Sequence, residues 1–348
     1  MFVKNTWYVA ARSDELSDKP LARQICGEKI VFYRDAAGRV AALEDFCPHR
    51  GAPLSLGFIE EGKLVCGYHG LKMGCDGKTD SMPKQRVQGF PCIQAYPTEE
   101  RHGFIWVWTG DATRAVRDEI PDFIWSDNPD WAYGGGLYHI ACDYRLMIDN
   151  LMDLTHETYV HASSIGQKEI DEAPVTTQVS GDEVITSRFM ENTSAPPFWQ
   201  AALKASGLAH DVPVDRWQIS RFTPPSHIMI EVGVAHAGKG GRDADTGHKV
   251  NAIVVDFITP ENEHSMWYFW GFARQFKPQD PSLTEQIREG QGKIFAEDLE
   301  MLERQQNNLQ NHFPERKLLK LDIDAGGVQA RRKLERLLQQ EQTQEERS

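Results

Sequence analysis

The sequence lacks any long apolar run. No stretch approaches the roughly 20 consecutive apolar residues that a membrane-spanning helix needs, and residues 1–6 do not begin a signal peptide. Basic residues are also scarce, since 38 Lys and Arg stand against 51 Asp and Glu, which gives a formal net charge of -13. A phosphate backbone binds to basic surfaces. These absences predict a cytoplasmic protein with neither a membrane nor a nucleic acid as partner.

Nucleotide-binding motifs are missing as well. The chain contains no G-x-G-x-x-G that follows a strand and opens a helix, no Walker A sequence and no four-cysteine ferredoxin pattern. Hydride transfer from NADH within this chain is therefore not expected, so any electrons would have to come from a separate NAD(P)H-dependent reductase. Six cysteines without a secretory signal do not indicate a disulfide framework. Reduced thiols, some of them bound to metal, are the expected state.

Two cysteines and two histidines stand in two short mixed motifs. Cys47 and His49 form C-x-H, and Cys66 and His69 form C-x₂-H after sixteen intervening residues. A Rieske [2Fe–2S] cluster has two Cys on one iron and two His on the other, so each motif would give one ligand to each iron. A structural Cys₂His₂ zinc site uses the same set, but its arms more often pair Cys with Cys and His with His. The mixed arms favour the cluster, and Cys75, which has no His at such spacing, is predicted to be a free thiol.

Hydrophobic patterning predicts an all-β N-terminal part followed by an α+β part. Strand-like runs rich in β-branched and aromatic residues occupy residues 5–11, 24–34, 39–46 and 103–108. A polar, proline-containing segment at about 111–130 is the predicted linker. Further alternating runs between 175 and 274 predict an antiparallel sheet, and helical periodicity predicts helices over 282–311 and 329–340. We therefore expect two domains, residues 1–115 and 116–348, the second with helices flanking its antiparallel sheet.

A second group of polar residues lies on a predicted helix around residue 150. His156 and His161 are five residues apart, about 140° around an ideal helix, so they can share one metal ion only if the helix bulges or ends between them. The alternative is that both are ordinary core histidines. Asp153, three residues before His156, is placed to accept a hydrogen bond from a metal-bound imidazole, and Asn150 precedes it by one turn.

Two histidines need a carboxylate to complete the 2-His-1-carboxylate triad of non-haem Fe(II) oxygenases. The segment 295–299 places two acids, Glu297 and Asp298, in an otherwise apolar helical turn. We expect Asp298 to be the third ligand, but spacing alone does not distinguish it from Glu297 or Glu300.

In combination these motifs resemble the Rieske non-haem iron oxygenases. The resemblance runs through the whole chain and rests on CPH with CGYH, on GFIWVW, on the N-x₂-D-x₂-H-x₄-H that begins at Asn150, and on EDFCPHRGAPLSLG and GQGKIFAEDL. It implies an N-terminal Rieske domain and a helix-grip, START-like catalytic domain. It also implies a [2Fe–2S] cluster on Cys47, His49, Cys66 and His69, and a mononuclear Fe(II) on His156, His161 and Asp298.

The resemblance further implies a homotrimer in which the cluster of one subunit faces the iron of the next. Asp153 would then bridge His69 and His156 across the interface, with Asn150 close by. The implied reaction is O-demethylation of vanillate to protocatechuate and formaldehyde, with O₂ and electrons relayed from a flavin or ferredoxin reductase. The alternative is a demethylase or methyl hydroxylase for another aromatic acid, such as a methoxybenzoate, dicamba or a toluenesulfonate.

An anionic aromatic substrate needs a cation or several hydrogen-bond donors around its carboxylate. Arg221 and His227, in the predicted central sheet, are the candidate contacts, although either could instead be a salt-bridged surface residue. Two other classes stay open. A Rieske electron carrier fused to an inert domain would lack the second iron, and a zinc module would be colourless.

Overall fold

The structure, a computed structural model, describes residues 1–162, 165–166, 169–312 and 316–346. The chain divides into two compact units, Met1–Phe123 with Thr259–Asn262, and Ile124–Ile258 with Glu263–Ser348. The predicted boundary at residues 115/116 falls inside the first unit, within the polar segment expected to link the domains. Among the described helices, none combines the length and hydropathy of a transmembrane span.

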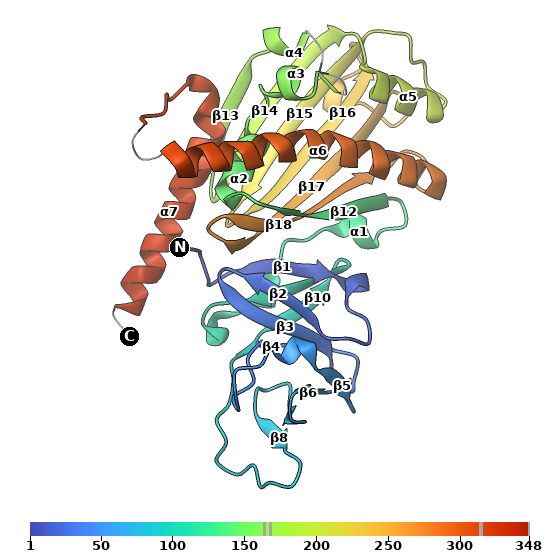
Figure 1. The fold of residues 1–348 in the computed structure, drawn as a ribbon. Helices are drawn as coiled ribbons and strands as arrows, with labels where there is room; N and C mark the ends of the chain where they lie inside the picture. Colours follow the sequence, from blue (N-terminus) through green and yellow to red (C-terminus); the bar gives the residue numbers. More distant parts are fainter. Residues whose placement is uncertain (163–164, 167–168, 313–315, 347–348) are drawn as a thin grey trace. The chain divides into compact units, whose positions relative to one another are not determined.

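The first unit is built of small sheets, as the strand-like patterns predicted (Figure 1). One sheet holds β1 (Trp7–Arg12), β11 (Phe104–Trp108) and β10 (Thr98–Arg101) in that order. A second holds β2 (Leu21–Ile25), β3 (Glu28–Arg34), β4 (Val40–Glu44) and β9 (Ala95–Tyr96). The third holds β5 (Phe58–Glu60), β6 (Lys63–Val65), β7 (Lys72–Met73) and β8 (Thr79–Ser81). All five residues of β11 are buried, which explains its unbroken apolar sequence.

The strand expected over residues 24–34 is instead a hairpin. β2 ends at Ile25 and pairs with β3, which begins at Glu28. The two turn residues, Cys26 and Gly27, have φ values of 52° and 85°. Two consecutive residues with positive φ make a tight turn whose twist matches that of the flanking strands. The apolar run hides this turn because only Gly27 carries a turn signal.

The second unit contains one seven-stranded antiparallel sheet, which confirms the predicted α+β class. In spatial order its strands are β12 (Ala132–Ile140), β18 (Ser265–Arg274), β17 (Lys249–Asn262), β16 (His227–His236), β15 (Val214–Thr223), β14 (Glu183–Thr193) and β13 (Val175–Ser180). The helices are α1 (Ile124–Asp127), α2 (Tyr144–Met152), α3 (Glu157–Val160), α4 (Glu169–Glu172), α5 (Pro197–Ala205), α6 (Pro281–His312) and α7 (Ala325–Glu345). Figure 1 shows α6 running across the sheet, with α2 and α3 on the same face. The core of this unit lies between the sheet and the helices on this face.

The helix predicted around residue 150 is broken. Asp143 caps the start of α2 by accepting a hydrogen bond from the Arg145 N–H at 2.8 Å, and the helix ends at Met152. Asp153 then has extended backbone angles, and its carboxylate accepts the Thr155 N–H at 2.7 Å. Such an aspartate offers the backbone a local alternative to the helix. The chain therefore turns before it forms the short helix α3.

The central sheet of this unit contains a buried acid. Asp256 of β17 is completely buried, and it accepts a hydrogen bond of 2.6 Å from the hydroxyl of Tyr268 on β18. Burial raises the pKa of Asp256 to about 7, an effect that the Tyr268 hydrogen bond opposes and the Asp298 carboxylate reinforces. A carboxyl in the unfolded chain titrates near 3.9. The folded protein therefore favours the protonated form over the interval between these values.

This pKa shift predicts a pH-dependent stability. Because the folded-state pKa of Asp256 is raised, its contribution is fully present below about pH 4 and is lost as pH rises through about 7. Asp256→Asn cannot ionise, so its melting temperature should fall less than that of the wild type between pH 5 and pH 8. Exposed Asp182→Asn is the control and should follow the wild type. Parallel melting curves for Asp256→Asn and the wild type would contradict the prediction.

Candidate metal centres

The four residues of the two mixed motifs lie on a matched pair of loops in the first unit. Cys47 follows β4 and Cys66 follows β6. In each loop the cysteine N–H donates at 2.8 Å to the carbonyl five residues later, and the cysteine carbonyl accepts from a glycine N–H, Gly51 at 2.8 Å or Gly70 at 3.0 Å. Both glycines have positive φ, 69° and 77°. A left-handed turn is thus built into each loop, and it brings the side chains that follow each cysteine back toward the sulfur.

The thiols and imidazoles are arranged in two layers. Cys47 and Cys66 are buried, whereas the rings of His49 and His69 lie nearer the surface with centroids 4.6 Å apart. Burial raises the pKa of the Cys47 thiol, and hydrogen bonds from the backbone N–H groups of His49 and Arg50 to its sulfur oppose that rise. Nδ1 of His69 is buried without a hydrogen-bond partner in the described part of the chain. This donor set, with N–H groups at a sulfur and a ring nitrogen left for a ligand, fits a Rieske cluster. Cys75 is exposed and free.

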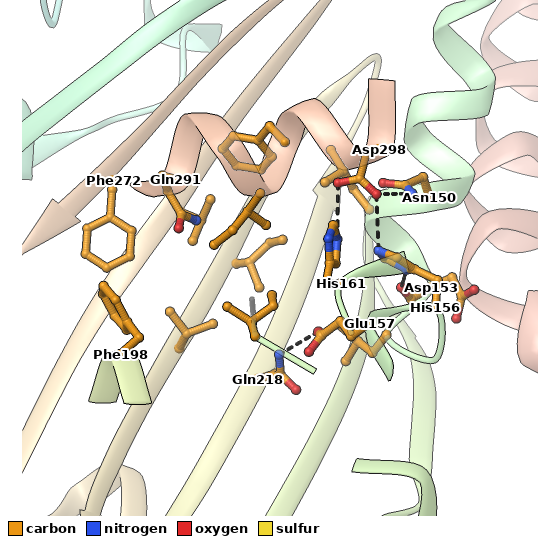
Figure 2. Close-up of a pocket in the computed structure, with 18 of the residues that line it drawn as sticks. Asn150, Asp153, His156, Glu157, His161, Phe198, Gln218, Phe272, Gln291 and Asp298 are labelled. Carbon is orange, nitrogen blue, oxygen red and sulfur yellow. Dashed lines mark hydrogen bonds and ion pairs between the residues drawn. The ribbon is translucent and has the colours of Figure 1, made fainter. Parts of the chain in front are cut away.

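In the second unit, His156, His161 and Asp298 converge on one point (Figure 2). Their candidate ligand atoms all lie within 4.8 Å of one another. Nε2 of His156 is 3.6 Å from one Asp298 oxygen, and Nε2 of His161 is 3.3 Å from the other. The two histidines can meet because they flank the single turn of α3, one as its N-cap and the other as its C-cap. Two imidazoles and one carboxylate form the donor set of a facial triad for Fe(II).

The other ring nitrogen of each histidine is held by the protein. Nδ1 of His156 lies 2.6 Å from the carbonyl oxygen of Asp153, and Nδ1 of His161 lies 2.8 Å from the carboxylate of Glu297. Both acceptors require a proton on Nδ1, which leaves the lone pair of each Nε2 for the metal. Burial alone would lower the pKa of His161, but hydrogen bonds and charge from Asp298 and Glu297 raise it overall. An Fe(II) ion would displace that extra proton.

The supporting residues differ in part from those expected. Glu297 contacts His161 and does not join the triad, and exposed Glu300 lies away from it. Within one chain His156 does not donate the predicted hydrogen bond to the Asp153 carboxylate, because Asp153 ends α2 and its carboxylate accepts from Thr155. Its backbone carbonyl makes the contact. Asn150 donates a 3.0 Å hydrogen bond to Asp298 and so orients the carboxylate.

A cavity opens from this triad between α6 and the sheet. Its apolar lining comes from the helices and the central strands, and the aromatic side chains Phe198 and Phe272 stand at the end away from Asp298 (Figure 2). The other apolar lining residues are Leu151, Leu154, Ile165, Trp199, Ile230, Val232, Val254, Ile294 and Phe295. Such a site suits an aromatic ring, since apolar surface contributes most of the contact and a few polar groups fix its orientation.

Neither predicted substrate contact lines this cavity. The strand residues that do line it, such as Gln218 of β15 and Ile230 of β16, have even numbers. Side chains alternate between the faces of a sheet, so Arg221 and His227 point to the opposite face. Arg221 lies 3.8 Å from Glu183 there, as an ion pair. Neither Arg221 nor His227 is therefore placed to contact a substrate in this cavity, contrary to the prediction.

A buried polar network lies beside the triad and was not predicted from the sequence. Glu157 of α3 accepts a 2.6 Å hydrogen bond from Gln218, whose amide oxygen accepts one of 3.0 Å from Nε of Arg188 on β14. Arg188 also donates at 2.7 Å to the carbonyl of Leu154 and so holds the segment that leads to His156. The only signal was the alternation of polar and apolar residues in β15, which normally indicates a solvent-facing polar side. Here the polar side faces the core.

Glu297→Ala tests the support of His161. Loss of the acceptor at Nδ1 frees the imidazole to rotate or to change tautomer, and such losses typically weaken metal binding by about 10- to 100-fold. We expect that fall in Fe(II) affinity, measured by titration of metal-depleted protein, with a smaller effect for Glu297→Gln, whose amide oxygen still accepts. Unchanged affinity in Glu297→Ala would show that the contact has no influence on the metal.

Two family models match this chain, one in each part. Residues 6–97 match the Rieske [2Fe-2S] domain, and residues 140–340 match the vanillate O-demethylase oxygenase C-terminal domain. The vanillate O-demethylase oxygenase subunit of Pseudomonas sp. (strain HR199 / DSM 7063) is 72% identical over 342 residues, 98% of this chain and 96% of that protein. The crystal structure of dicamba monooxygenase bound to 3,6-dichlorosalicylic acid has a TM-score of 0.90 at 32% identity, with 98% of each chain covered. Another, with non-haem iron and dicamba, has a TM-score of 0.85 at 30% identity and 99% coverage of each chain.

Proposed function

The chain belongs to the vanillate O-demethylase oxygenase family of Rieske non-haem iron monooxygenases, and we propose on that premise that its substrate is vanillate. The observation that carries the proposal is an apolar cavity, lined in part by aromatic side chains, that opens onto the His156, His161 and Asp298 triad. It occurs in a chain that is 72% identical to a vanillate O-demethylase oxygenase subunit over nearly its full length. The likeness to dicamba O-demethylase is much lower, at 33% identity.

The products follow from the chemistry of an aryl methyl ether. Vanillate, O₂ and two electrons with two protons give protocatechuate, formaldehyde and water. One oxygen atom enters a methyl C–H bond, and the resulting hemiacetal collapses to the phenol and formaldehyde. We assign a mononuclear Fe(II) to His156, His161 and Asp298, where it supplies O₂ activation beside the substrate. The apolar lining holds the ring and keeps water away from that point.

We assign a [2Fe–2S] cluster to Cys47, His49, Cys66 and His69, where it would supply one-electron transfer. Because the relatives are oxygenase components of multicomponent systems, a separate reductase is required to collect electrons from NAD(P)H. The enzyme then works in the cytoplasm, where that pyridine nucleotide is available. These assignments give each of the seven metal-binding side chains one role.

A homotrimer completes the electron path in this proposal. Large apolar side chains are exposed at Phe46 and Tyr68, next to the proposed cluster ligands, and at Leu56 and Phe58 in the segment between them, with exposures of 46 to 79%. Exposed apolar side chains of this size favour burial against another subunit. The carboxylate of Asp153 is half-buried in this chain, so it can accept a hydrogen bond from His69 of a neighbouring subunit. Asp153 would then join the cluster of one subunit to the iron site of the next through its own contact with His156.

A substrate panel tests the proposed function. Purified protein, a flavin or ferredoxin reductase and NADH should convert vanillate to protocatechuate and formaldehyde in equal amounts, with one O₂ consumed for each turnover. Reactions without reductase or without O₂ should yield neither product. Dicamba, 4-methoxybenzoate and toluene-4-sulfonate should react much more slowly at equal concentration. If kcat/KM for any of these three compounds were higher than for vanillate, that compound would be the substrate in place of vanillate.

A further inference from the structure

One basic side chain in the cavity has no role in the metal sites described above. Arg216 of β15 lines the cavity with only 4% of its surface exposed. Among the described residues that line the cavity, it is the only one that carries a guanidinium or an ammonium group. A buried guanidinium is expensive to desolvate unless opposite charge surrounds it. The reason for its position must therefore lie in the charges around it.

The acid beside Arg216 is shared with a second arginine. The Glu157 carboxylate lies 3.3 Å from Arg188 and 3.8 Å from Arg216, so one buried acid is shared between two buried guanidinium groups. Burial lowers the pKa of Arg216, and of the two neighbouring charges that act on it, Glu157 raises that pKa while Arg188 lowers it. Arg188 has further acidic neighbours in Asp153 and Asp171. A carboxylate that enters the cavity would be a second anion beside Arg216 and could accept hydrogen bonds from its guanidinium.

Arg188, Glu157, Gln218 and Arg216 differ in whether they can reach a ligand in the cavity. Arg188 does not line the cavity, and its donors go to the Leu154 carbonyl and the Gln218 amide oxygen. Gln218 lines the cavity, but its amide nitrogen donates to Glu157. Arg216 is the member that combines positive charge with a place on the cavity wall. Ile230 and Val232, on the adjacent strand β16, line the same cavity and would lie against a ring whose carboxylate is bound at Arg216.

We propose that Arg216 binds the carboxylate of the aromatic substrate and thereby selects aromatic acids over neutral methoxyphenols. This inference rests on the proposed function, because it assumes a substrate that carries one carboxylate. A guanidinium can donate two parallel hydrogen bonds to a carboxylate, which fixes the orientation of the ring as well as its charge. The methoxy group, on a different carbon of the ring, is then held in one orientation within the cavity.

Binding measurements without O₂ test the inference independently of turnover. Calorimetric titration of the iron-loaded protein with vanillate, benzoate and 2-methoxyphenol would compare wild type, Arg216→Gln and Arg216→Lys. Loss of a charge-assisted interaction should raise the Kd for vanillate and benzoate by roughly 10- to 100-fold in Arg216→Gln. The Kd for 2-methoxyphenol should change by less than about threefold, since that ligand has no carboxylate to lose the contact. Arg216→Lys should recover part of the affinity for both acids.

Two results would overturn the inference. One is an Arg216→Gln protein that binds vanillate as tightly as the wild type. The other is an equal loss of affinity for acids and for 2-methoxyphenol, because that pattern shows a structural role. Visible absorbance of the cluster and the melting temperature report folding, and if Arg216→Gln does not fold, Arg216→Lys alone decides by the same acid-to-phenol ratio.

The same titrations separate this inference from the proposed function. If the wild-type protein binds benzoate through Arg216 but releases no formaldehyde from vanillate, the anion site is supported and vanillate is excluded as the substrate. If the wild-type protein demethylates vanillate while Arg216→Gln retains its preference for acids, vanillate is supported and the anion site at Arg216 is excluded.

Discussion

Asp298→Ala is expected to stop formaldehyde release completely while the visible absorbance of the [2Fe–2S] cluster stays at the wild-type level. Asp298 is buried and gives the only carboxylate among the three side chains that converge on the candidate iron site. Two neutral histidines that remain after its loss supply neither the charge nor the third ligand that a facial triad needs. The cluster loops belong to the other compact unit, so the four ligands proposed there are untouched.

The measurement pairs a formaldehyde assay with iron and sulfide analysis of the same protein. Iron should fall from three atoms to two for each chain, because the cluster holds two irons and the triad one. Glu300→Ala is the matched control, since this acid lies on the same helix about 200° away and forms an exposed ion pair with Arg304. It should keep both iron content and activity. If Glu297→Ala lost the third iron and Asp298→Ala retained it, the ligand assignment would be reversed.

The choice between Glu297 and Asp298 shows where sequence reasoning stops. Adjacent residues on a helix point about 100° apart, so one of them can face the site while the other faces its edge. Which of them faces the site depends on how α6 is rotated against the sheet, and that rotation is set by packing along the whole helix. In the structure each acid has its own contact. Asp298 lies at the candidate metal position, and Glu297 lies against Nδ1 of His161.

The cluster loops were more predictable because their geometry is local. Each motif keeps a cysteine and a histidine within four residues, and a glycine with positive φ closes each loop, at Gly51 and Gly70. No distant packing is needed to bring these ligands together within one loop. By contrast, Arg221 was chosen for its charge without knowledge of which face of the sheet is covered. In a strand, a choice that is wrong by one residue points to the opposite face, and Arg216 and Gln218 occupy the face that matters.

Asp153→Asn is expected to reduce turnover almost to zero although both metal sites stay filled. Within one chain the substitution is mild. The backbone carbonyl of residue 153 still accepts from His156, and the amide oxygen of Asn can still accept the Thr155 N–H that Asp153 binds at 2.7 Å. Iron content, cluster absorbance and oligomer size should therefore match the wild type. What disappears is the negative charge that the proposed intersubunit contact presents to His69 of the neighbouring subunit.

That loss should appear as blocked electron transfer. Hydrogen bonds to a charged acceptor are roughly twice as strong as neutral ones, and the Asn amide also adds a donor that opposes an imidazole N–H. In rapid mixing of pre-reduced protein with vanillate and O₂, the Asp153→Asn cluster should stay reduced while the wild-type cluster reoxidises. Asn150→Ala provides the contrast, because Asn150 donates to Asp298 and its loss should lower iron occupancy without slowing reoxidation in the subunits that retain iron. If the Asp153→Asn cluster reoxidised at the wild-type rate, electrons would not pass through Asp153, and its carboxylate would serve only to end α2.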